Sequence, residues 1–515
     1  MFRNCLLAAL GILYSIQPVY PATNSLTFPI QGTFVNFYRN LTPELWTLEF
    51  ESMKALDMNT VVVVSVGHLR PDSNDPNGYS LAPDGLLYPS SFVDASERPT
   101  TDLLEMILSL ADQRGMKVYV GSLQTATDWS DGTEFNAPRA QNKEVAAEIV
   151  QRYGWHTSLV GWYFTQEIWM NWVKYYGALN GNTAAGYYGT VQMANWIADM
   201  KAIDPGKLAT AAVVVKKDGT GAMPGLTPAE LQTWTASLLQ TAPLDILMPQ
   251  DGIGAGDGAP GIDDLGNYFS AMKQATGTTT ALWSTIETFT ADPNLSSERF
   301  PPAPISRIQS QVNAVAPYVS GYVSWIFGND MSPQATYYPV EASELNRQYQ
   351  FTFKPEMFPA YGILPLASYW FSAPPIASYA DTTPLPSKLS DRTGGGYNGS
   401  DLSSWVGFAD DNYGSGTVQI TADLGAPKQI HLIRALTQSW TGFGIYRPSQ
   451  IDVEVSQDNW TWIPFGSTSA LPADTPNFAV MWGEVQGSAN AQWVRWTFHF
   501  NEWLFLAELE VIGDQ

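Results

Sequence analysis

Short apolar runs alternate with amphipathic segments from residue 32 to about residue 350. Runs rich in Val, Ile, Leu and aromatic residues predict eight strands, at 32–38, 59–68, 116–124, 158–168, 208–215, 245–256, 280–289 and 321–330. The second run contains Val61 to Val64 in succession, which is typical of a parallel strand buried on both faces.

Segments with helical periodicity separate these runs. They predict helices at 42–57, 101–115, 142–155, 187–207, 227–242, 264–277, 304–319 and 341–349. Strands that alternate with helices in this number close naturally into an α/β (β/α)8 TIM barrel. An open doubly wound sheet is the alternative. It is less favoured because no glycine-rich phosphate loop follows any of the strands.

The pattern changes after Pro333. Short alternating strands are predicted at 416–425, 429–440, 449–466, 492–500 and 506–513, with turn residues between them, which indicates an all-β sandwich. We therefore divide the chain into an N-terminal segment (1–22), a barrel (23–350), a connector (351–384) and a sandwich (385–515).

The N-terminal segment has the pattern of a secretory signal peptide. Arg3 precedes an apolar run at 5–16, and small residues end at Ala22. The run is too short to span a membrane, so we expect a secreted, extracellular protein without membrane insertion. The single cysteine, Cys5, lies in this segment, which excludes disulfides and thiolate catalysis in the mature chain.

Composition narrows the range of ligands. The formal net charge is -23 with only 15% charged residues, so the chain lacks the basic footprint of a nucleic-acid-binding protein. A neutral, polyhydroxylated substrate fits this charge better. The 19 tryptophans serve either as large cores or as platforms for sugar rings. We expect a monomer.

Catalytic residues of such barrels lie at the C-terminal ends of the strands. The polar residues at these ends are Asn36, His68, Gln124, Gln166, Glu167, Lys216, Lys217, Asp218, Gln250, Asp251, Glu287, Asn329 and Asp330. Glu167 and Glu287 stand out because each ends an aromatic, apolar strand. Two carboxyl groups in different environments are the machinery of glycoside hydrolysis.

Three of these residues also have a purely structural interpretation. Glu167 is alternatively a structural ion paired with a lysine or arginine. Asp251 is alternatively a turn residue in "PQDGIG", and His68 a hydrogen-bonded scaffold residue. No cluster has the ligand spacing of a catalytic metal, and no Gly-x-Ser-x-Gly motif indicates a serine hydrolase.

Glutamates on the fourth and seventh strands of a barrel resemble glycoside hydrolase clan A. The resemblance implies a retaining mechanism with Glu167 as acid/base and Glu287 as nucleophile. Gln166 stands where the clan has an asparagine that contacts the sugar. "GTFVNFY", "GWYFTQEIW" and "MPQDGIG" also look like a group of secreted barrel proteins regarded as glycosidases. We predict these substrate-binding residues: Gln166, Tyr163, Gln250, Asp251, His68, Asn36 and Trp325.

The C-terminal segment resembles the discoidin-type (coagulation-factor C-type) module through "LSDRTGGGYNGSDLSSWVGF", "GIYRPSQIDVEVSQDNWTWIPFG" and "AELEVIG". The resemblance implies a jelly-roll sandwich that binds carbohydrate. It also implies a structural calcium ion held by Asp391 and Glu508, whose oxygen ligands suit Ca²⁺. No cofactor is expected for catalysis. Two alternatives to the hydrolase are a non-catalytic carbohydrate-binding protein on a barrel scaffold and a polysaccharide lyase or transglycosylase.

Overall fold

A computed structural model of the chain supplies the architecture. The residues that it describes are 28–35, 42–71, 79–125, 139–171, 173–174, 188–217, 225–256, 258–292, 294–295, 300–355, 361–381, 387–392, 404–409, 416–468, 474 and 478–514. Within these ranges, no helix combines the length and the apolar character that crossing a membrane requires.

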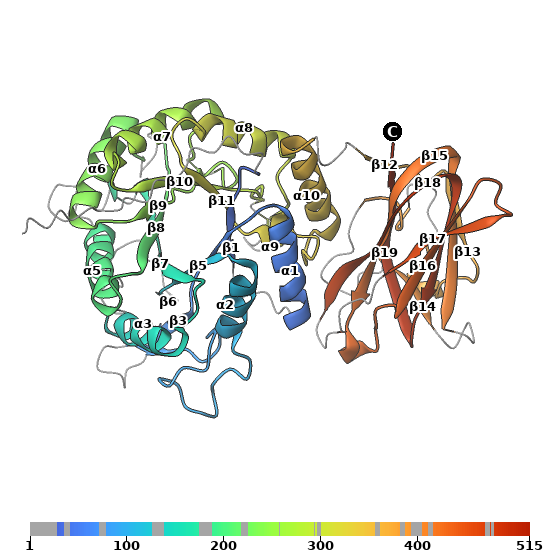
Figure 1. Cartoon of the computed structure of the whole chain (residues 1–515), viewed down its shortest axis with the longest axis horizontal. Coiled ribbons are helices and arrows are strands. Elements are labelled where there is room, and N and C mark those ends of the chain that lie inside the picture. Colours follow the sequence, from blue (N-terminus) through green and yellow to red (C-terminus); the bar gives the residue numbers. More distant parts are fainter. Residues whose placement is uncertain are drawn as a thin grey trace, which may run out of the picture.

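Eight parallel strands close into a barrel (Figure 1), as the sequence predicts. Around the barrel, each strand pairs with its neighbours in the order β1-β11-β10-β9-β8-β7-β5-β2. Their bounds are β1 (Gly32–Val35), β2 (Thr60–Val63), β5 (Lys117–Gly121), β7 (Leu159–Trp169), β8 (Leu208–Val214), β9 (Ile246–Leu247), β10 (Ala281–Ile286) and β11 (Gly321–Ser324). The open doubly wound sheet is thereby excluded.

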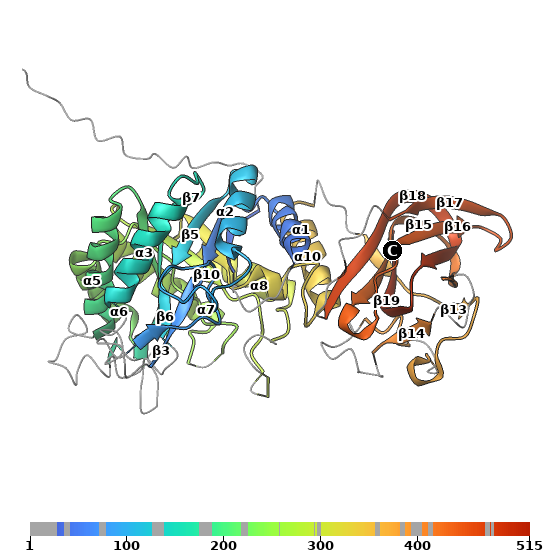
Figure 2. The same cartoon turned by 90° about the horizontal axis from the view of Figure 1, so that it is seen from below.

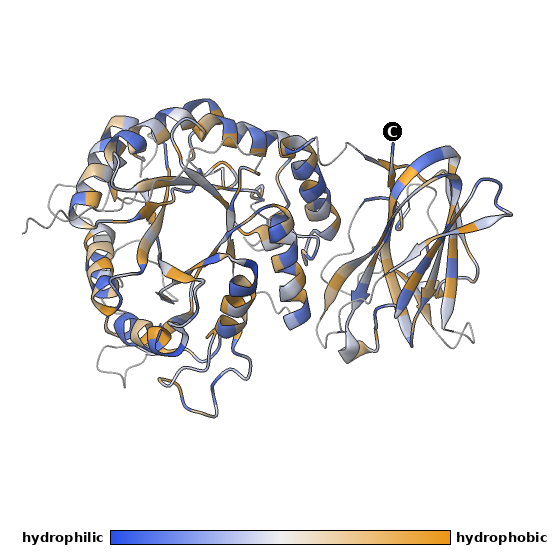
Figure 3. Cartoon of the chain, in the orientation of Figure 1, coloured by the Kyte–Doolittle hydropathy of each residue, from blue (hydrophilic) through white to orange (hydrophobic). Residues whose placement is uncertain are grey.

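Helices surround the barrel (Figure 1). They are α1 (Pro43–Ala55), α2 (Leu103–Arg114), α3 (Arg139–Tyr153), α5 (Tyr188–Ile203), α6 (Pro228–Thr241), α7 (Ile262–Thr276), α8 (Ile305–Val315), α9 (Phe327–Asp330) and α10 (Pro339–Phe353). Along these helices hydrophilic and hydrophobic positions alternate, as the blue and orange segments of Figure 3 show. The helices can therefore bury one face against the strands while the other meets water.

Two separate apolar clusters fill the barrel domain. One lies inside the barrel and includes Phe34 and Tyr163. The other lies between the strands and the helices and includes Trp162 and Phe164. Along β7, successive side chains thus point alternately outward and inward, as strand geometry requires. This alternation decides which strand-end residues reach the site.

A small sheet extends two of the barrel strands (Figure 2). It contains β3 (Gly67–Pro71), β4 (Tyr79–Leu81) and β6 (Leu123–Thr125) in the order β4-β3-β6. The predicted strands 59–68 and 116–124 are therefore each two strands. The hydroxyl of Thr165 lies 2.9 Å from the carbonyl oxygen of Val64 and 3.0 Å from that of Ser122. The hydroxyl thus meets these two carbonyl groups just beyond the ends of β2 and β5, where a backbone N–H of a neighbouring strand would meet them inside the sheet.

The C-terminal part is an antiparallel all-β sheet domain, hereafter the sheet domain (Figure 1). Its central order is β12-β19-β15-β18-β16-β17, with β13 paired to β15 and β14 paired to β19. The bounds are β12 (Gly362–Leu364), β13 (Ser368–Phe371), β14 (Val406–Ala409), β15 (Thr417–Ser439), β16 (Gln450–Ser456), β17 (Trp462–Ser467), β18 (Ala479–His499) and β19 (Trp503–Gly513).

Three sequence predictions change in this domain. The single strand predicted at 449–466 is two antiparallel strands, β16 and β17. Strands β12 and β13 lie within the range 351–384, for which the sequence predicts a connector, so this segment contributes to the sheet. The predicted strands 416–425 and 429–440 form one long strand, β15, with register shifts between Asp423 and Lys428 and between Ile430 and Leu432. Such bulges let a strand bend without ending, which the turn-like "LGAPK" does not reveal.

Helix α10 packs against the sheet domain through a buried cation. Arg434 of β15 is ion-paired to Glu510 at 2.6 Å and to Glu484 at 3.2 Å. Its Nη1 also donates to the Ser343 hydroxyl of α10 at 2.7 Å, and its guanidinium lies 4.0 Å from the centre of the Trp482 ring. The same charge thus stabilises the sheet and the contact between the domains.

We expect Arg434→Met to lower the free energy of unfolding by about 3–5 kcal/mol, because Glu510 would be left as an uncompensated buried charge. Urea unfolding of the full chain measures the change. The double variant Arg434→Met/Glu510→Met is the control, and it should recover part of the loss. A single variant as stable as the unaltered chain would contradict this account.

Candidate active site

Glu167 lies near the end of β7 and is held by two side-chain donors. Its Oε1 accepts a hydrogen bond from Nε2 of Gln250 at 3.0 Å, and its Oε2 accepts one from Nε1 of Trp169 at 3.0 Å. The residue is only partly buried. Two N–H donors on different strand ends thus fix the orientation of the Glu167 carboxyl group.

Glu287 directly follows β10 and is buried. Its Oε2 accepts a hydrogen bond from the backbone N–H of Ala255 at 2.7 Å. A Cβ on Gly254 would lie 2.8 Å from the Cβ of Glu287, so only glycine lets the segment after β9 approach this closely. That segment encloses one side of the glutamate.

Asp251 is buried beside Glu287. Its Oδ1 accepts hydrogen bonds from the backbone N–H of Ile253 at 3.2 Å and from that of Glu287 at 3.4 Å. Its Oδ2 accepts one from Nε2 of Gln311 at 2.6 Å. Donors of the protein therefore engage both oxygens. The side chain of Asp251 holds the backbone of Glu287 and does not lie open to a ligand.

Helix α8 supplies two polar residues beneath this pair. Gln311 donates to Asp251 and, at 3.3 Å, to the backbone carbonyl of Glu287. Arg307 donates to the same carbonyl at 3.0 Å and to that of Phe289. The two residues are one helical turn apart, so a single face of α8 holds the chain where β10 ends.

The two buried carboxyl groups have perturbed pKa values. Burial, followed by repulsion from Asp251, raises the pKa of Glu287 to about 8, while the N–H of Ala255 and the charge of Lys216 oppose the rise. Glu167 adds a smaller repulsion, so the two glutamates are near enough to interact. Burial also raises the pKa of Asp251, against the hydrogen bond from Gln311.

Lys216 places a cation beside the glutamates. It follows β8, is buried, and its Nζ lies 4.4 Å from the centre of the Trp169 ring. The same indole donates to Glu167. Residues from the ends of three strands, β7, β8 and β10, thus interact in the site. The Trp169 ring contacts both Glu167 and Lys216, and the charge of Lys216 acts on Glu287.

The structure places Tyr163 and Trp325 next to Phe34 inside the barrel. Their ring centroids lie 5.2 Å and 5.0 Å from that of Phe34. Ile326, which follows Trp325, has φ 54°, an unfavourable conformation for a β-branched residue. This strained turn redirects the chain directly after the barrel strand.

Gln166 points away from the site. It lines a small cavity with Phe164, Trp196 and Asp199 between β7 and the outer helices, and its Nε2 donates to the carbonyl of Leu123 at 3.1 Å. The structure therefore corrects its predicted contact with substrate. Neighbouring strand residues point to opposite faces, and Glu167 takes the inward position.

The structure describes one of the two remaining predicted residues. His68 belongs to β3 of the small sheet, and its Nε2 lies 4.0 Å from the carboxylate of Asp84. Asn36 lies outside the described residues. The structure thus brings together Glu167, Gln250, Asp251 and Glu287, with Tyr163 and Trp325 inside the same barrel.

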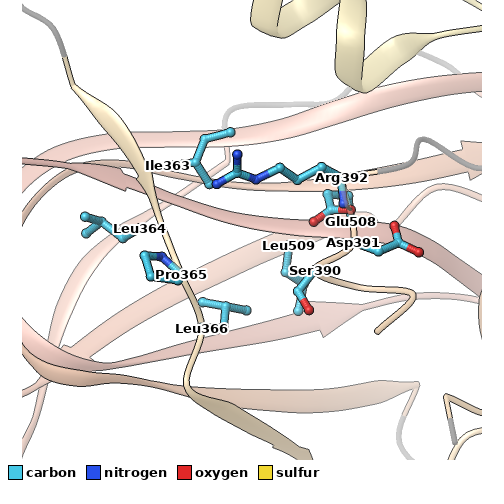
Figure 4. A pocket seen from close by; sticks show the side chains of 9 residues that line it. All are labelled: Ile363, Leu364, Pro365, Leu366, Ser390, Asp391, Arg392, Glu508 and Leu509. Carbon is cyan, nitrogen blue, oxygen red and sulfur yellow. Dashed lines mark hydrogen bonds between the residues drawn. The ribbon is translucent and has the colours of Figure 1, made fainter. Parts of the chain in front are cut away.

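The predicted calcium ligands line a cavity of about 400 Å³ in the sheet domain (Figure 4). Burial raises the pKa of Glu508 to about 10, with Glu510 and Asp391 adding repulsion. Figure 4 shows the Asp391 carboxyl group pointing away from Glu508. Within the described ranges, no group of three or more His, Cys, Asp or Glu side chains is arranged to hold a metal ion.

Three residues of the site have no role predicted from the sequence. Lys216 stands among the strand-end polar residues, but its position alone indicates no function. Arg307 and Gln311 lie four positions apart on the face of α8 that also buries Ile308 and Val312. Polar residues that recur on an apolar helix face are the signal that could have identified them.

Comparison with known families assigns residues 30–337 to the "Domain of unknown function (DUF4434)". The chain belongs to this family. No curated protein matches it. A crystal structure described as a candidate alpha-L-fucosidase from Bacteroides thetaiotaomicron is similar to the DUF4434 chain, with 21% identity, a TM-score of 0.52, and coverage of 64% of this chain and 96% of that one. At this identity the similarity supports the barrel fold alone.

Two other solved structures are more distant from the DUF4434 chain. A Ruminococcus gnavus GH29 fucosidase has 11% identity and a TM-score of 0.30, and the match covers 95% of this chain and 92% of that one. A chitosan-binding module from Paenibacillus has 15% identity and a TM-score of 0.21, with 29% and 97% covered.

We expect Glu287→Gln to stabilise the protein, and to do so more strongly as pH rises. The folded protein binds the Glu287 proton more tightly than the unfolded chain does, so the unaltered chain loses stability between the ordinary glutamate pKa, about 4.3, and the raised value. Glutamine does not titrate. Urea unfolding at pH 4, 6 and 8 should show a gain on the order of 1–3 kcal/mol at pH 8 that shrinks toward pH 4. A gain independent of pH would refute the buried-proton account.

Proposed function

We propose that the DUF4434 barrel is a glycoside hydrolase that cleaves a neutral poly- or oligosaccharide with Glu167 and Glu287. One observation carries the proposal. Two carboxyl groups lie near each other at the C-terminal ends of barrel strands in opposite environments, one held by two donors and one buried with a raised pKa. Such a pair supplies the acid and the nucleophile or base that this reaction needs.

The environments favour definite roles for the two glutamates. Glu287 retains its proton at neutral pH and would donate it to the leaving-group oxygen. Glu167, held by Gln250 and Trp169, would attack the anomeric carbon, and Glu287 would then deprotonate the water that releases the sugar. This assignment reverses the roles that the resemblance to clan A implies. It rests on the contacts of each carboxyl group.

The charge of the chain and the site composition favour a neutral sugar. A net charge of -23 disfavours polyanions, and the aromatic rings of Trp169 and Trp325 suit the apolar faces of a pyranose. The similarity to a candidate fucosidase places aryl α-L-fucosides in the substrate panel beside aryl glucosides, galactosides, xylosides and mannosides.

Activity of Glu→Gln variants on this panel tests the proposal. Both Glu167→Gln and Glu287→Gln should lower kcat/KM by at least about 10³-fold on glycosides with poor leaving groups. With a dinitrophenyl leaving group, which needs no protonation, Glu287→Gln should keep kcat for the first step whereas Glu167→Gln should not. Glu144→Gln, on the exposed face of α3, is the charge control.

Three outcomes would contradict the proposal. Unchanged turnover in Glu167→Gln removes the residue from the mechanism. Unsaturated products would indicate a lyase. Saccharide binding without turnover of any substrate would favour a non-catalytic carbohydrate-binding barrel.

We also propose that the sheet domain is a discoidin-type carbohydrate-binding module and that the protein is secreted. The sequence resemblance supports the first proposal, and the pattern of residues 1–22, which lie outside the described ranges, supports the second. Asp391 and Glu508 offer oxygen ligands. Burial is the main cause of the raised pKa of Glu508, and a cation would offset the repulsion that Glu510 and Asp391 add to it. These residues would hold a structural calcium ion.

Calcium should raise the thermal unfolding temperature of the full chain, and a chelator should reverse the rise. A stabilising ion acts by RT ln(1 + [L]/Kd), so the shift should grow with calcium concentration. Asp391→Asn should abolish the response, whereas Asp204→Asn, in the turn after α5, should preserve it. A melting temperature indifferent to calcium and chelator would argue against a structural ion.

A further inference from the structure

The solvent-facing surface of the sheet domain carries tryptophans from three strands, hereafter the Trp strip: Trp370 of β13, Trp493 of β18 and Trp462 of β17. The Trp370 and Trp493 rings meet edge to face, with centroids 5.6 Å apart. Trp370 is 41% exposed. The strip is separate from the apolar core, which the alternate residues of the same strands form.

Strand register fixes the spacing of the strip. Ser456 of β16 pairs with Trp462 on one side and with Trp493 on the other. These two tryptophans therefore lie two strand spacings apart, roughly 10 Å. Trp370 extends the row by way of β15, since it pairs with Thr421, which pairs with Arg495. The rings thus cross five strands, and the end strands of this row, β13 and β17, lie on the side of the domain away from the barrel (Figure 1).

The Trp462 ring of the strip is held in place by a cation on one of its faces. The Arg495 guanidinium lies 4.1 Å from the centre of the Trp462 ring, and Nη2 of Arg495 is ion-paired to Glu454 at 2.6 Å. One face of the indole is therefore covered by a fixed cation. A ring that is already immobilised loses little conformational entropy when a ligand stacks on its other face.

Four charged side chains on this face form two ion pairs. Besides Arg495 with Glu454, Nε2 of His499 lies 2.8 Å from the carboxylate of Asp452. Gln419 donates to the Thr497 hydroxyl at 3.2 Å. The face thus combines flat rings with polar groups and ion-paired side chains, which matches a neutral ligand that has apolar ring faces and hydroxyl edges.

We propose that the Trp strip binds an extended, neutral polysaccharide chain, with sugar rings stacked along Trp370, Trp493 and Trp462. The spacing between Trp493 and Trp462 is on the scale of a disaccharide, so these two rings engage alternate sugars of one chain, and Trp370 widens the aromatic platform beside Trp493. This site deepens the saccharide binding proposed for the sheet domain, and it is independent of hydrolysis by the barrel. It would hold the barrel near a polymeric substrate.

Affinity electrophoresis of the full-length Glu167→Gln variant tests the proposal without hydrolysis. The gels contain soluble β-glucan, xylan, galactomannan or glycol chitosan. Retardation is expected in at least one polymer, and Trp370→Ala/Trp462→Ala should weaken the apparent affinity about tenfold or more. Trp155→Ala removes a 67% exposed tryptophan from the barrel and should change nothing.

A second comparison locates the site within the domain. Phe443 is 67% exposed in a turn of the sheet domain, next to Trp440 at a ring-centroid distance of 4.2 Å. Phe443→Ala should leave retardation unchanged. Loss of binding in Phe443→Ala with full binding in the Trp-strip variant would overturn the strip but preserve saccharide binding by the domain.

The remaining outcomes also decide the question. No retardation in any polymer would overturn both the strip and the proposed role of the domain. Binding that persists in every tryptophan variant and in Phe443→Ala would overturn the strip as the binding site. Circular dichroism and urea unfolding of each variant confirm that the sheet is intact, since the substituted side chains lie outside its core.

Discussion

Two carboxyl groups, those of Asp251 and Glu287, are enclosed side by side where β9 and β10 end, and a folded chain retains such a pair only when surrounding donors hold it. Backbone N–H groups of the segment after β9 supply some of these donors, and Gln311 of α8 supplies another. The rest of the site follows from this burial. It keeps a proton on Glu287, whereas the carboxyl group of Glu167 is only partly buried and is held by two side-chain N–H donors.

The barrel is what makes such an arrangement stable. Eight closed strands leave no edge, and the apolar clusters inside and outside the wall fix each strand end. Burying the two carboxyl groups lowers the stability of the fold, and the packing of the barrel offsets this loss. This relation is usual where a rigid scaffold holds a strained site. A buried charge is also held by its partners between α10 and the sheet domain. There Arg434 is ion-paired to Glu510 and donates to the hydroxyl of Ser343.

Strand counting alone identified the barrel and brought Glu167 and Glu287 to one end of it, because parallel strands end on the same side. It could not place Gln166, which adjoins Glu167 in sequence but faces the helices. The resemblance to a known motif outweighed strand alternation there. Gln311 and Arg307 were missed because their contacts come from a helix distant in sequence. The strands β3 and β6 were missed because their apolar runs continue those of β2 and β5.

Titration of the glutamate side chains by ¹³C nuclear magnetic resonance tests the central claim, that burial beside Asp251 keeps Glu287 protonated. The chain is labelled at the glutamate carboxyl carbons, and Glu287→Gln assigns the resonance. The account predicts that this resonance titrates near pH 8, well above the ordinary value of about 4.3, and that Asp251→Asn lowers its pKa. A Glu287 resonance that titrates near the ordinary value would contradict the account.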